Sequence, residues 1–224
     1  MKLEIEHGEA VPSVAHITLD RAESTVVLAD AVALSRNVGP DAHIWLHGST
    51  EERDEMLADA GYVTDRALLQ MRVTLPVESP SVATTPLKET DIDELIAVNN
   101  RAFHWHPEQS GLTRGAFDSD RSQDWFEPEG VRLHRIDGAL AGFCWTKIHE
   151  EPEALGEIYV IAVDPAFHGR GLGKPVTMAG LDWLTQQGLT IGMLYVESDN
   201  GAAVATYRGL GFDTHRIDRL WTPA

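Results

Sequence analysis

The sequence predicts a mixed α/β protein, in which helices pack on a sheet that contains both parallel and antiparallel strands. Two observations lead to this fold class: short apolar segments alternate with helical patterns, and a glycine-rich loop joins one such segment to a helix. Apart from these two, the end of the chain has a weak counterpart in its first half, which bears on the number of domains. The 224 residues can form one large domain or two small ones.

Two helices and a hairpin are expected ahead of the glycine-rich loop. Helical spacing begins after Asp91, the expected N-cap, and a second helix is predicted near residues 114–126. The dipeptide Asp137-Gly138 separates two apolar stretches, which indicates a β-hairpin over 131–149. These elements are expected to form the first part of a sheet.

After the hairpin, the chain is expected to alternate strand and helix. The segment 157–163 is continuously apolar after its first residue, which predicts a strand buried on both faces. A helix is predicted over 171–187, where Pro175 requires that the helix begin late or lose a bond in its first turns. A strand over 191–198, a helix over about 201–209 and a closing strand or hairpin follow.

The first half repeats the end of the second half at an offset of 150 residues, so that 43–76 runs parallel to 193–223. The loop glycines have no counterpart there, and Tyr207 falls opposite Leu57. A stretch rich in Pro, Ser and Thr, which lacks periodicity, separates the halves. We therefore expect a degenerate, incomplete domain over 1–78, a linker over 79–86 and a complete domain over 87–224.

The composition argues against several kinds of partner. A net charge of −17 would repel nucleic-acid phosphates, so no nucleic acid is expected. No apolar run reaches the roughly 18 residues that span a membrane, and no signal-peptide pattern is present, so we expect a cytoplasmic protein with no membrane partner. The single cysteine, Cys144, is expected to be a small buried residue rather than a nucleophile.

The glycine-rich loop, HGRGLG at 168–173, is suited to bind an anion. A nucleotide pyrophosphate needs close approach to main-chain N–H groups and to the N-terminus of a helix, and side chains would obstruct both. Because the chain as a whole is strongly acidic, binding an anionic cofactor requires a local group of this kind rather than a general positive field. The loop lies between an expected strand and an expected amphipathic helix, which strengthens this interpretation.

Two charged residues flank the connection that precedes the loop. Lys147 and Glu157 are symmetric about residue 152, so an antiparallel connection centred there would place them opposite each other. An ion pair and a contact to substrate remain equally open for Lys147. We expect Glu157 to share a strand face with Tyr159 and Ile161 and to act as a base toward an ammonium group.

Asn200 and Tyr207 are seven residues apart and are expected to share one helix face. The phenol could act as a general acid or could simply pack. His104, His106 and Glu108 lie close together, but their spacing is not that of a recognised zinc site. We therefore expect no metal, and a polar loop lining a substrate cleft at these positions.

Together these segments resemble the GNAT (GCN5-related N-acetyltransferase) superfamily, with His168 at a loop position that the family fills with Gln or Arg. The resemblance implies a GNAT acyl-CoA N-acyltransferase fold, acetyl-CoA as co-substrate, a splay between the strands at 157–163 and 191–196, an oxyanion held by main-chain N–H near Ile161, and Tyr207 as the acid toward the CoA thiolate. The implied cofactor contacts are Ile161, Ala162, Val163, His168, Gly169, Arg170, Gly171, Leu172, Gly173, Lys174, Asn200, Ala202 and Ala203.

A closer resemblance is to the mycothiol synthases, which are GNAT proteins with a degenerate N-terminal domain. It rests on VNNRAFHWHPEQSG (98–111), GFCWTKIH (142–149), LGEIYVIAVDP (155–165) and LYVESDNGAAVATYRGLGF (194–212). That family acetylates the cysteinyl amine of a cysteine–glucosamine–inositol conjugate. The implied substrate contacts are Glu108, Lys147, Glu157 and Tyr195.

The family's N-terminal domain is shortened in this sequence to about its second half, which leaves alternatives open. The acceptor could be another amine, such as a polyamine, an aminoglycoside or a peptide terminus. The chain could also be an acetyl-CoA-binding module that does not catalyse a reaction. Either a monomer or a homodimer is expected, since a half domain leaves a sheet edge to cover.

Overall fold

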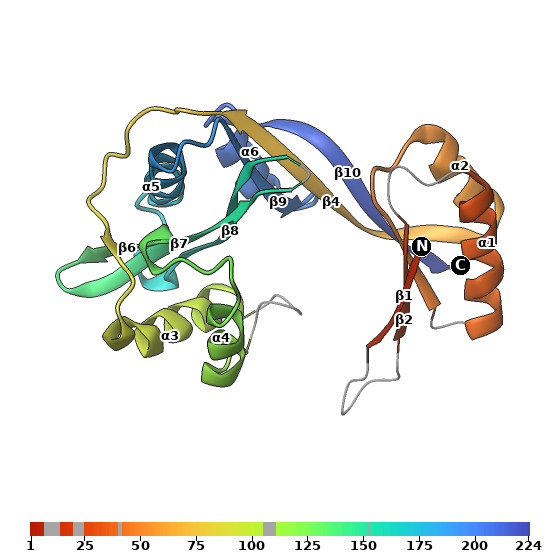
Figure 1. The fold of residues 1–224 in the computed structure, drawn as a ribbon, viewed down its shortest axis with the longest axis horizontal. Coiled ribbons are helices and arrows are strands. Elements are labelled where there is room, and N and C mark those ends of the chain that lie inside the picture. The colour runs from red at the N-terminus through yellow and green to blue at the C-terminus, as the bar shows by residue number, and fades with distance from the viewer. Residues whose placement is uncertain (7–13, 20–24, 40–41, 105–110, 152) are drawn as a thin grey trace. The chain divides into compact units, whose positions relative to one another are not determined.

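The computed structural model describes residues 1–6, 14–19, 25–39, 42–104, 111–151 and 153–224 (Figure 1). Its helices and strands form the mixed α/β fold that the sequence predicts. The chain divides into two compact units. The first unit comprises 1–71, 195–204 and 214–224, and the second comprises 72–194 and 205–213.

The first unit contains the end of the sheet that runs from β1 to β4, together with α1 and α2 (Figure 1). Its elements are β1 (Lys2–Glu6), β2 (Val14–Leu19), α1 (Thr25–Val38), β3 (Ala42–Leu46), α2 (Glu51–Asp59), β4 (Tyr62–Thr74) and β10 (Asp213–Pro223). The strand order is β1-β2-β3-β10-β4. The pairing is antiparallel for β1–β2 and β3–β10 and parallel for β2–β3. Fully buried Ile17, Leu28, Ile44 and Leu57 belong to its core.

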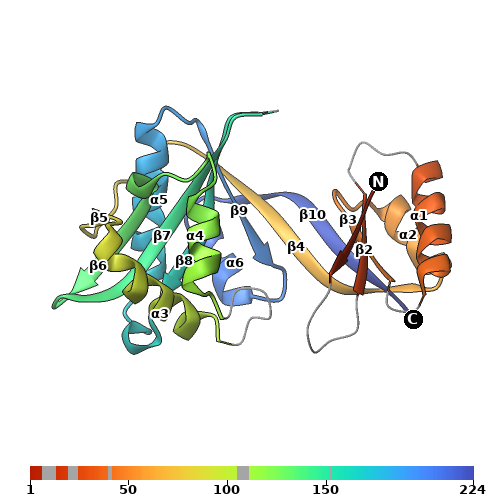
Figure 2. The same cartoon turned by 60° about the horizontal axis from the view of Figure 1, so that its bottom comes forward.

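The second unit contains most of the helices and strands that follow residue 72. Those wholly within it are β5 (Thr85–Pro86), α3 (Ile92–Ala102), α4 (Arg114–Arg121), β6 (Val131–Ile136), β7 (Ala139–His149), β8 (Leu155–Val163) and α5 (Gly173–Gln186). It also contains β9 (Ile191–Glu197) up to residue 194 and α6 (Gly201–Arg208) from residue 205, and the rest of these two elements belongs to the first unit. The strand order is β4-β9-β8-β7-β6-β5. Figure 2 shows α3 and α4 on one face of β7 and β8, and α5 on the other. The core on the α3 face includes Leu95, Phe117, Phe143 and Trp145.

Two strands are exchanged between the repeats. The order β3-β10-β4-β9 means that the last strand of the second repeat pairs with β3 of the first repeat. In turn, β4, which ends the first repeat, neighbours β9 of the second. The sequence predicts a closing strand at the end of the chain, but not its neighbour.

Local signals fix several element boundaries. Asp137 and Gly138 both have positive φ, 51° and 86°, as a tight hairpin turn between β6 and β7 requires. Pro175 is the third residue of α5, so its missing N–H falls among first-turn groups that have no partner within the helix. The helix predicted to reach residue 126 ends earlier, because Ser122 caps α4 in a tight turn.

A β-bulge changes the predicted faces of β8. Tyr159 is an extra residue on β8 that has no counterpart on β7. Ile161 therefore pairs with Cys144, which is buried against Gly180 of α5. The expectation that Ile161 shares a face with Glu157 is wrong, because the bulge shifts the alternation of side chains by one residue. The expectation that Cys144 is buried is confirmed.

The repeat is visible in matching helix ends. The Thr50 side chain accepts a hydrogen bond from the Arg53 N–H at the start of α2, and Asn200 Oδ1 accepts one from the Ala203 N–H at the start of α6. Gly61 and Gly211, which follow these helices, have φ of 87° and 89°. None of the helices in the described ranges is long and apolar enough to cross a membrane.

Candidate active site

The glycine-rich loop enters α5 with an open backbone. Gly169 and Gly171 have φ of 74° and 70°, in the left-handed region that favours glycine. A Cβ added at Gly169, Gly171 or Gly173 would meet no heavy atom within 4 Å. The Leu172 side chain makes no capping hydrogen bond to α5. The loop therefore fits a bound pyrophosphate, which would contact its main-chain N–H groups and the N-terminus of α5.

Side chains around the loop hold its shape. His168 Nε2 lies 3.0 Å from the Val163 carbonyl oxygen, and the Arg170 guanidinium lies 5.0 Å from the centre of the Phe167 ring. Lys174 Nζ is 3.5 Å from the carbonyl oxygen of Gly209, just after α6. All three side chains are exposed, and Arg170 and Lys174 add positive charge at this edge of an acidic protein.

An ion pair anchors the start of the loop to α3. The buried Asp164 carboxylate accepts hydrogen bonds from Arg101 and, at 2.9 Å, from the Ala166 N–H. Burial alone would raise the pKa of Asp164, but these hydrogen bonds and the charge of Arg101 outweigh it, so the pKa is lowered. The carboxylate therefore stays ionised and fixes the turn that leaves β8.

The parallel ladder between β8 and β9 is short. It consists of three pairs, from Gly156–Gly192 to Ile158–Leu194, although β8 continues to Val163. This is the expected splay. Among the described strands, Ile161, Ala162 and Val163 pair with β7 on one side and with none on the other, so main-chain groups on that other side can hydrogen-bond a ligand.

Lys147 and Glu157 lie opposite each other on β7 and β8, which confirms the register predicted from their symmetry. They form no ion pair with each other among the described residues. Lys147 Nζ instead lies 4.4 Å from the ring centre of Trp125 and 5.5 Å from that of Tyr159. Glu157, only 7% exposed, has its Oε2 atom 2.7 Å from His149 Nε2.

His149 is the residue of this group that the sequence analysis missed. It lies two residues after Lys147, so alternation along β7 places both side chains on the face of Glu157. That spacing could have indicated it. The sequence alone does not tell which of the two basic side chains reaches the carboxylate.

Tyr207 lies near the end of α6 and is 9% exposed. Burial raises the pKa of its phenol to about 12, and the nearby Cys144 acts in the same direction. Its ring centre lies 5.9 Å from that of Phe212. Within the described ranges no hydrogen bond engages its hydroxyl, which stays protonated at neutral pH and can donate to a ligand.

The other expected contacts lie in different settings. The Asn200 side chain caps α6, which gives it a structural role beside any cofactor contact, and Ala202 and Ala203 follow in the first turn of that helix. The Tyr195 hydroxyl accepts hydrogen bonds from Gln70 and Arg216. Glu108 and His106 lie outside the described residues. In the part of the chain that the structure describes, no group of His, Cys, Asp and Glu side chains could hold a metal ion.

Comparison with known proteins gives the family. Residues 98–212 match the acetyltransferase (GNAT) family model. Curated relatives named mycothiol acetyltransferase are 39% identical in Rhodococcus erythropolis, 44% in Mycolicibacterium smegmatis and 39% in Nocardia farcinica. The matches cover 83%, 82% and 95% of this chain and 67%, 65% and 74% of those relatives. The chain thus spans about two thirds of the length of the curated relatives that it matches.

Solved structures agree on the fold. A GCN5-related N-acetyltransferase from Sphaerobacter thermophilus has a TM-score of 0.71 at 16% identity, covering 98% of this chain and 75% of that one. A tandem GNAT protein from the clavulanic acid biosynthesis pathway has a TM-score of 0.60 at 17% identity, covering 98% and 77%. The GNAT fold expected from the sequence is confirmed, and the chain belongs to the GNAT family of acetyltransferases.

Proposed function

We propose that this chain is an acetyl-CoA-dependent N-acetyltransferase whose acceptor is the cysteinyl amine of a cysteine–glucosamine–inositol conjugate. The observation that carries acetyl transfer is the open glycine loop that follows β8, a strand that separates from its parallel neighbour and holds a buried carboxylate, Glu157, near its start. The acceptor is supported by the relatives named mycothiol acetyltransferase. The GNAT family uses acetyl-CoA.

Acetyl-CoA is proposed to bind along the open side of β8. Main-chain groups of Ile161–Val163 would hold the pantetheine arm, and those of 168–174 the pyrophosphate. Asn200, Ala202 and Ala203 are proposed to add contacts from the start of α6. An N–H near Ile161 would stabilise the oxyanion that forms on the thioester carbonyl.

In the proposed reaction, Glu157 takes a proton from the substrate ammonium, directly or through water. The neutral nitrogen attacks the thioester carbon and the C–N bond forms, which leaves the nitrogen positively charged. It gives up its second proton to solvent as the C–S bond breaks. The departing thiolate receives the proton of the Tyr207 hydroxyl, which is then restored from solvent. His149 holds the Glu157 carboxylate at 2.7 Å and so orients it, without touching the reacting atoms.

Lys147 is proposed to contact the acceptor rather than to pair with Glu157. Its ammonium group is held over Trp125 and Tyr159, and no hydrogen bond to another described residue engages its N–H donors, which can therefore reach a ligand oxygen. Glu108 and Tyr195 are the remaining proposed contacts. These contacts are the ones that the resemblance to the mycothiol synthases implies.

We also propose that residues 1–78 are a degenerate copy that has lost its cofactor site, followed by a linker over 79–86 and a catalytic domain over 87–224. Two observations support this. The parallel ladder of β2 and β3 pairs all five residues of β3, so it lacks the opening found between β8 and β9. The sequence LDRAE at 19–23 stands in place of the glycine loop. Calorimetric titration should therefore give one acetyl-CoA per chain, and two would reject the proposal.

The activity is tested by mixing acetyl-CoA with the conjugate and measuring CoA release. A polyamine, an aminoglycoside and a short peptide are tested in parallel. Release with the conjugate at the lowest KM supports the proposal, and preference for another amine would reassign the acceptor. Tight acetyl-CoA binding without release on any amine would instead indicate a binding module.

The catalytic roles are tested with conservative variants. Glu157→Gln and Tyr207→Phe should each lower kcat by about 100-fold or more, while the KM for acetyl-CoA changes little. Tyr62→Phe is the matched control, because its hydroxyl donates to Ser35 at 2.8 Å in the core of the first unit. It should cost stability and leave kcat unchanged; normal turnover by Tyr207→Phe would remove that residue from the mechanism.

A further inference from the structure

The Tyr195 hydroxyl oxygen accepts hydrogen bonds from two side chains of the first unit. Gln70 Nε2 on β4 lies 2.6 Å from it, and Arg216 Nη2 on β10 lies 2.9 Å from it. Gln70 is 3% exposed and Tyr195 is half-buried. Gln70 is therefore held against the oxygen by the packing of neighbouring strands rather than by a flexible surface contact.

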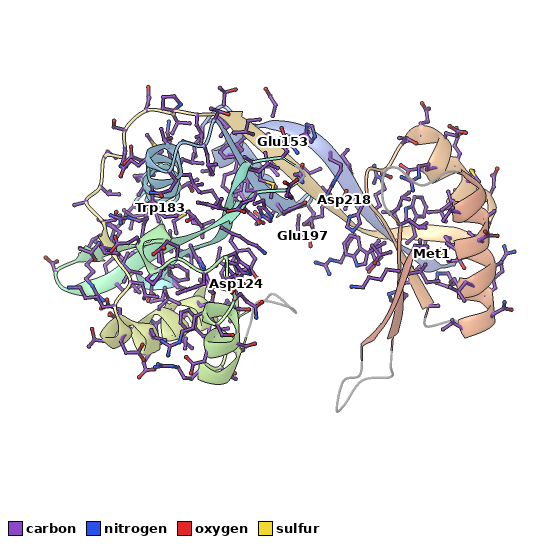
Figure 3. The ribbon with its side chains drawn as sticks, in the orientation of Figure 1. Met1, Asp124, Glu153, Trp183, Glu197 and Asp218 are labelled. Atoms are coloured by element: carbon purple, nitrogen blue, oxygen red, sulfur yellow. The ribbon has the colours of Figure 1, made fainter. Side chains whose placement is uncertain are left out.

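Arg216 is itself held by a buried carboxylate. Arg216 Nη2 lies 2.9 Å from Asp218 Oδ2, and Asp218 is 1% exposed (Figure 3 labels this residue). The same carboxylate receives the Gly48 N–H at 2.9 Å and lies 2.8 Å from His47 Nδ1. Burial opposes ionisation of Asp218, but its hydrogen bonds to His47 and Gly48 and the charge of Arg216 lower its pKa. A permanent charge pair thus fixes the guanidinium beside the phenol.

These contacts determine the direction of the one hydrogen bond that Tyr195 can still make. A phenol oxygen that accepts from an amide N–H and from a guanidinium N–H has its acceptor sites in use. Its own proton must then point to a third group. We infer that Gln70 and Arg216 are positioning residues that make the Tyr195 hydroxyl a hydrogen-bond donor to the substrate, which must offer an acceptor oxygen there. This inference rests on the proposed function.

The charges of the surrounding side chains favour a neutral oxygen over an anion. Arg216 is paired with Asp218, and Arg66, 5.8 Å from the ring centre of Trp45, is paired with Glu197. Each of these two guanidiniums is thus matched by a carboxylate, which weakens its attraction for an anionic group. A hydroxyl or ether oxygen of a sugar or polyol fits this surface. The substrate ammonium does not, because it cannot accept a hydrogen bond.

The inference is tested by reversing the direction of the hydrogen bond. In Gln70→Glu, the carboxylate accepts the Tyr195 proton and is stabilised by the adjacent Arg216, so the phenol can no longer donate to the substrate. Gln70→Leu is the matched control of similar size, which removes one donor and leaves the phenol free to donate outward. Tyr195→Phe removes the hydroxyl altogether.

We expect Gln70→Glu and Tyr195→Phe to raise the KM for the conjugate by a similar factor, about 3- to 10-fold, the value of one hydrogen bond. Gln70→Leu should raise it less. In all three variants kcat and the KM for acetyl-CoA should stay near those of the wild type, which a general loss of structure would not permit. Melting temperatures are measured alongside.

Two outcomes overturn the inference while the proposed function stands. One is a wild-type enzyme that acetylates the conjugate while Gln70→Glu leaves its KM unchanged. The other is an equal rise in KM for Gln70→Leu and Gln70→Glu, which would mean that packing, not hydrogen-bond direction, is what Gln70 supplies. A wild-type protein that does not acetylate the conjugate at all rejects the proposed function, and the inference with it.

Discussion

Replacing Gly171 by alanine tests two properties of the glycine loop: its backbone with positive φ and the open space beside it. At φ of 70°, any L-residue is strained, by about 1–2 kcal/mol. The added Cβ meets no protein atom within 4 Å, so it projects into space that a pyrophosphate would use. Losing one or two main-chain hydrogen bonds to a charged group costs about 1.5–3 kcal/mol, or roughly 10- to 100-fold in the KM for acetyl-CoA.

Gly138 provides the matched control. It has φ of 86° and equally open surroundings, but it lies in the turn between β6 and β7. Gly171→Ala and Gly138→Ala should therefore lose similar stability in urea unfolding. Steady-state kinetics with acetyl-CoA as the varied substrate should detect a raised KM in Gly171→Ala alone. If both variants keep the wild-type KM, the loop does not bind the pyrophosphate, and the reasoning from its open backbone is wrong.

Three further predictions concern stability. Because burial raises the pKa of Tyr207 and that of Cys144 each to about 12, each group contributes a loss of stability of about 1 kcal/mol per pH unit as the pH rises from about 10 toward 12. Tyr207→Phe should remove the share of the phenol in urea unfolding, and an unchanged loss would contradict the burial of that phenol. The pKa of Asp164 is lowered, so its contribution is present at neutral pH and lost as the pH falls through that pKa; Arg101→Met should shift the loss to higher pH, and an unshifted acid transition would exclude this ion pair as the cause. A Cβ added at Gly180 would lie 2.3 Å from the buried sulfur of Cys144, so Gly180→Ala should destabilise the protein by about 1–3 kcal/mol. At Gly115 the nearest atom would be 4.0 Å away, so Gly115→Ala should stabilise it by up to about 1 kcal/mol. Equal changes in the two variants would contradict the packing of α5.

Features with a local signal can be read from the sequence. The Asp137-Gly138 turn needs only its two residues, and the glycine loop only its position between a strand and a helix. The strand register that places Lys147 opposite Glu157 is also predictable, because a short antiparallel connection leaves few alternative registers. Each of these depends on neighbours a few residues apart along the chain.

Features that arise from packing between distant segments were not predictable. The bulge at Tyr159 turns Ile161 to the opposite face, and no residue pattern within β8 marks it. Either Lys147 or His149 could have reached the Glu157 carboxylate. Lys147 lies over the Trp125 ring instead, and His149 contacts Glu157. Strand alternation gives the face of each residue, whereas the choice of partner depends on helices that pack over that face.

The exchange of β4 and β10 has a consequence for the order in which the protein can fold. The antiparallel neighbour of β3 is a strand at residues 213–223, some 170 positions later. During synthesis, which runs from the N-terminus, α1, α2 and the first three strands must wait without this neighbour until nearly the whole sequence has left the ribosome. The unit encoded first is therefore the one completed last, and an exposed edge of β3 is a site for mispairing during that interval.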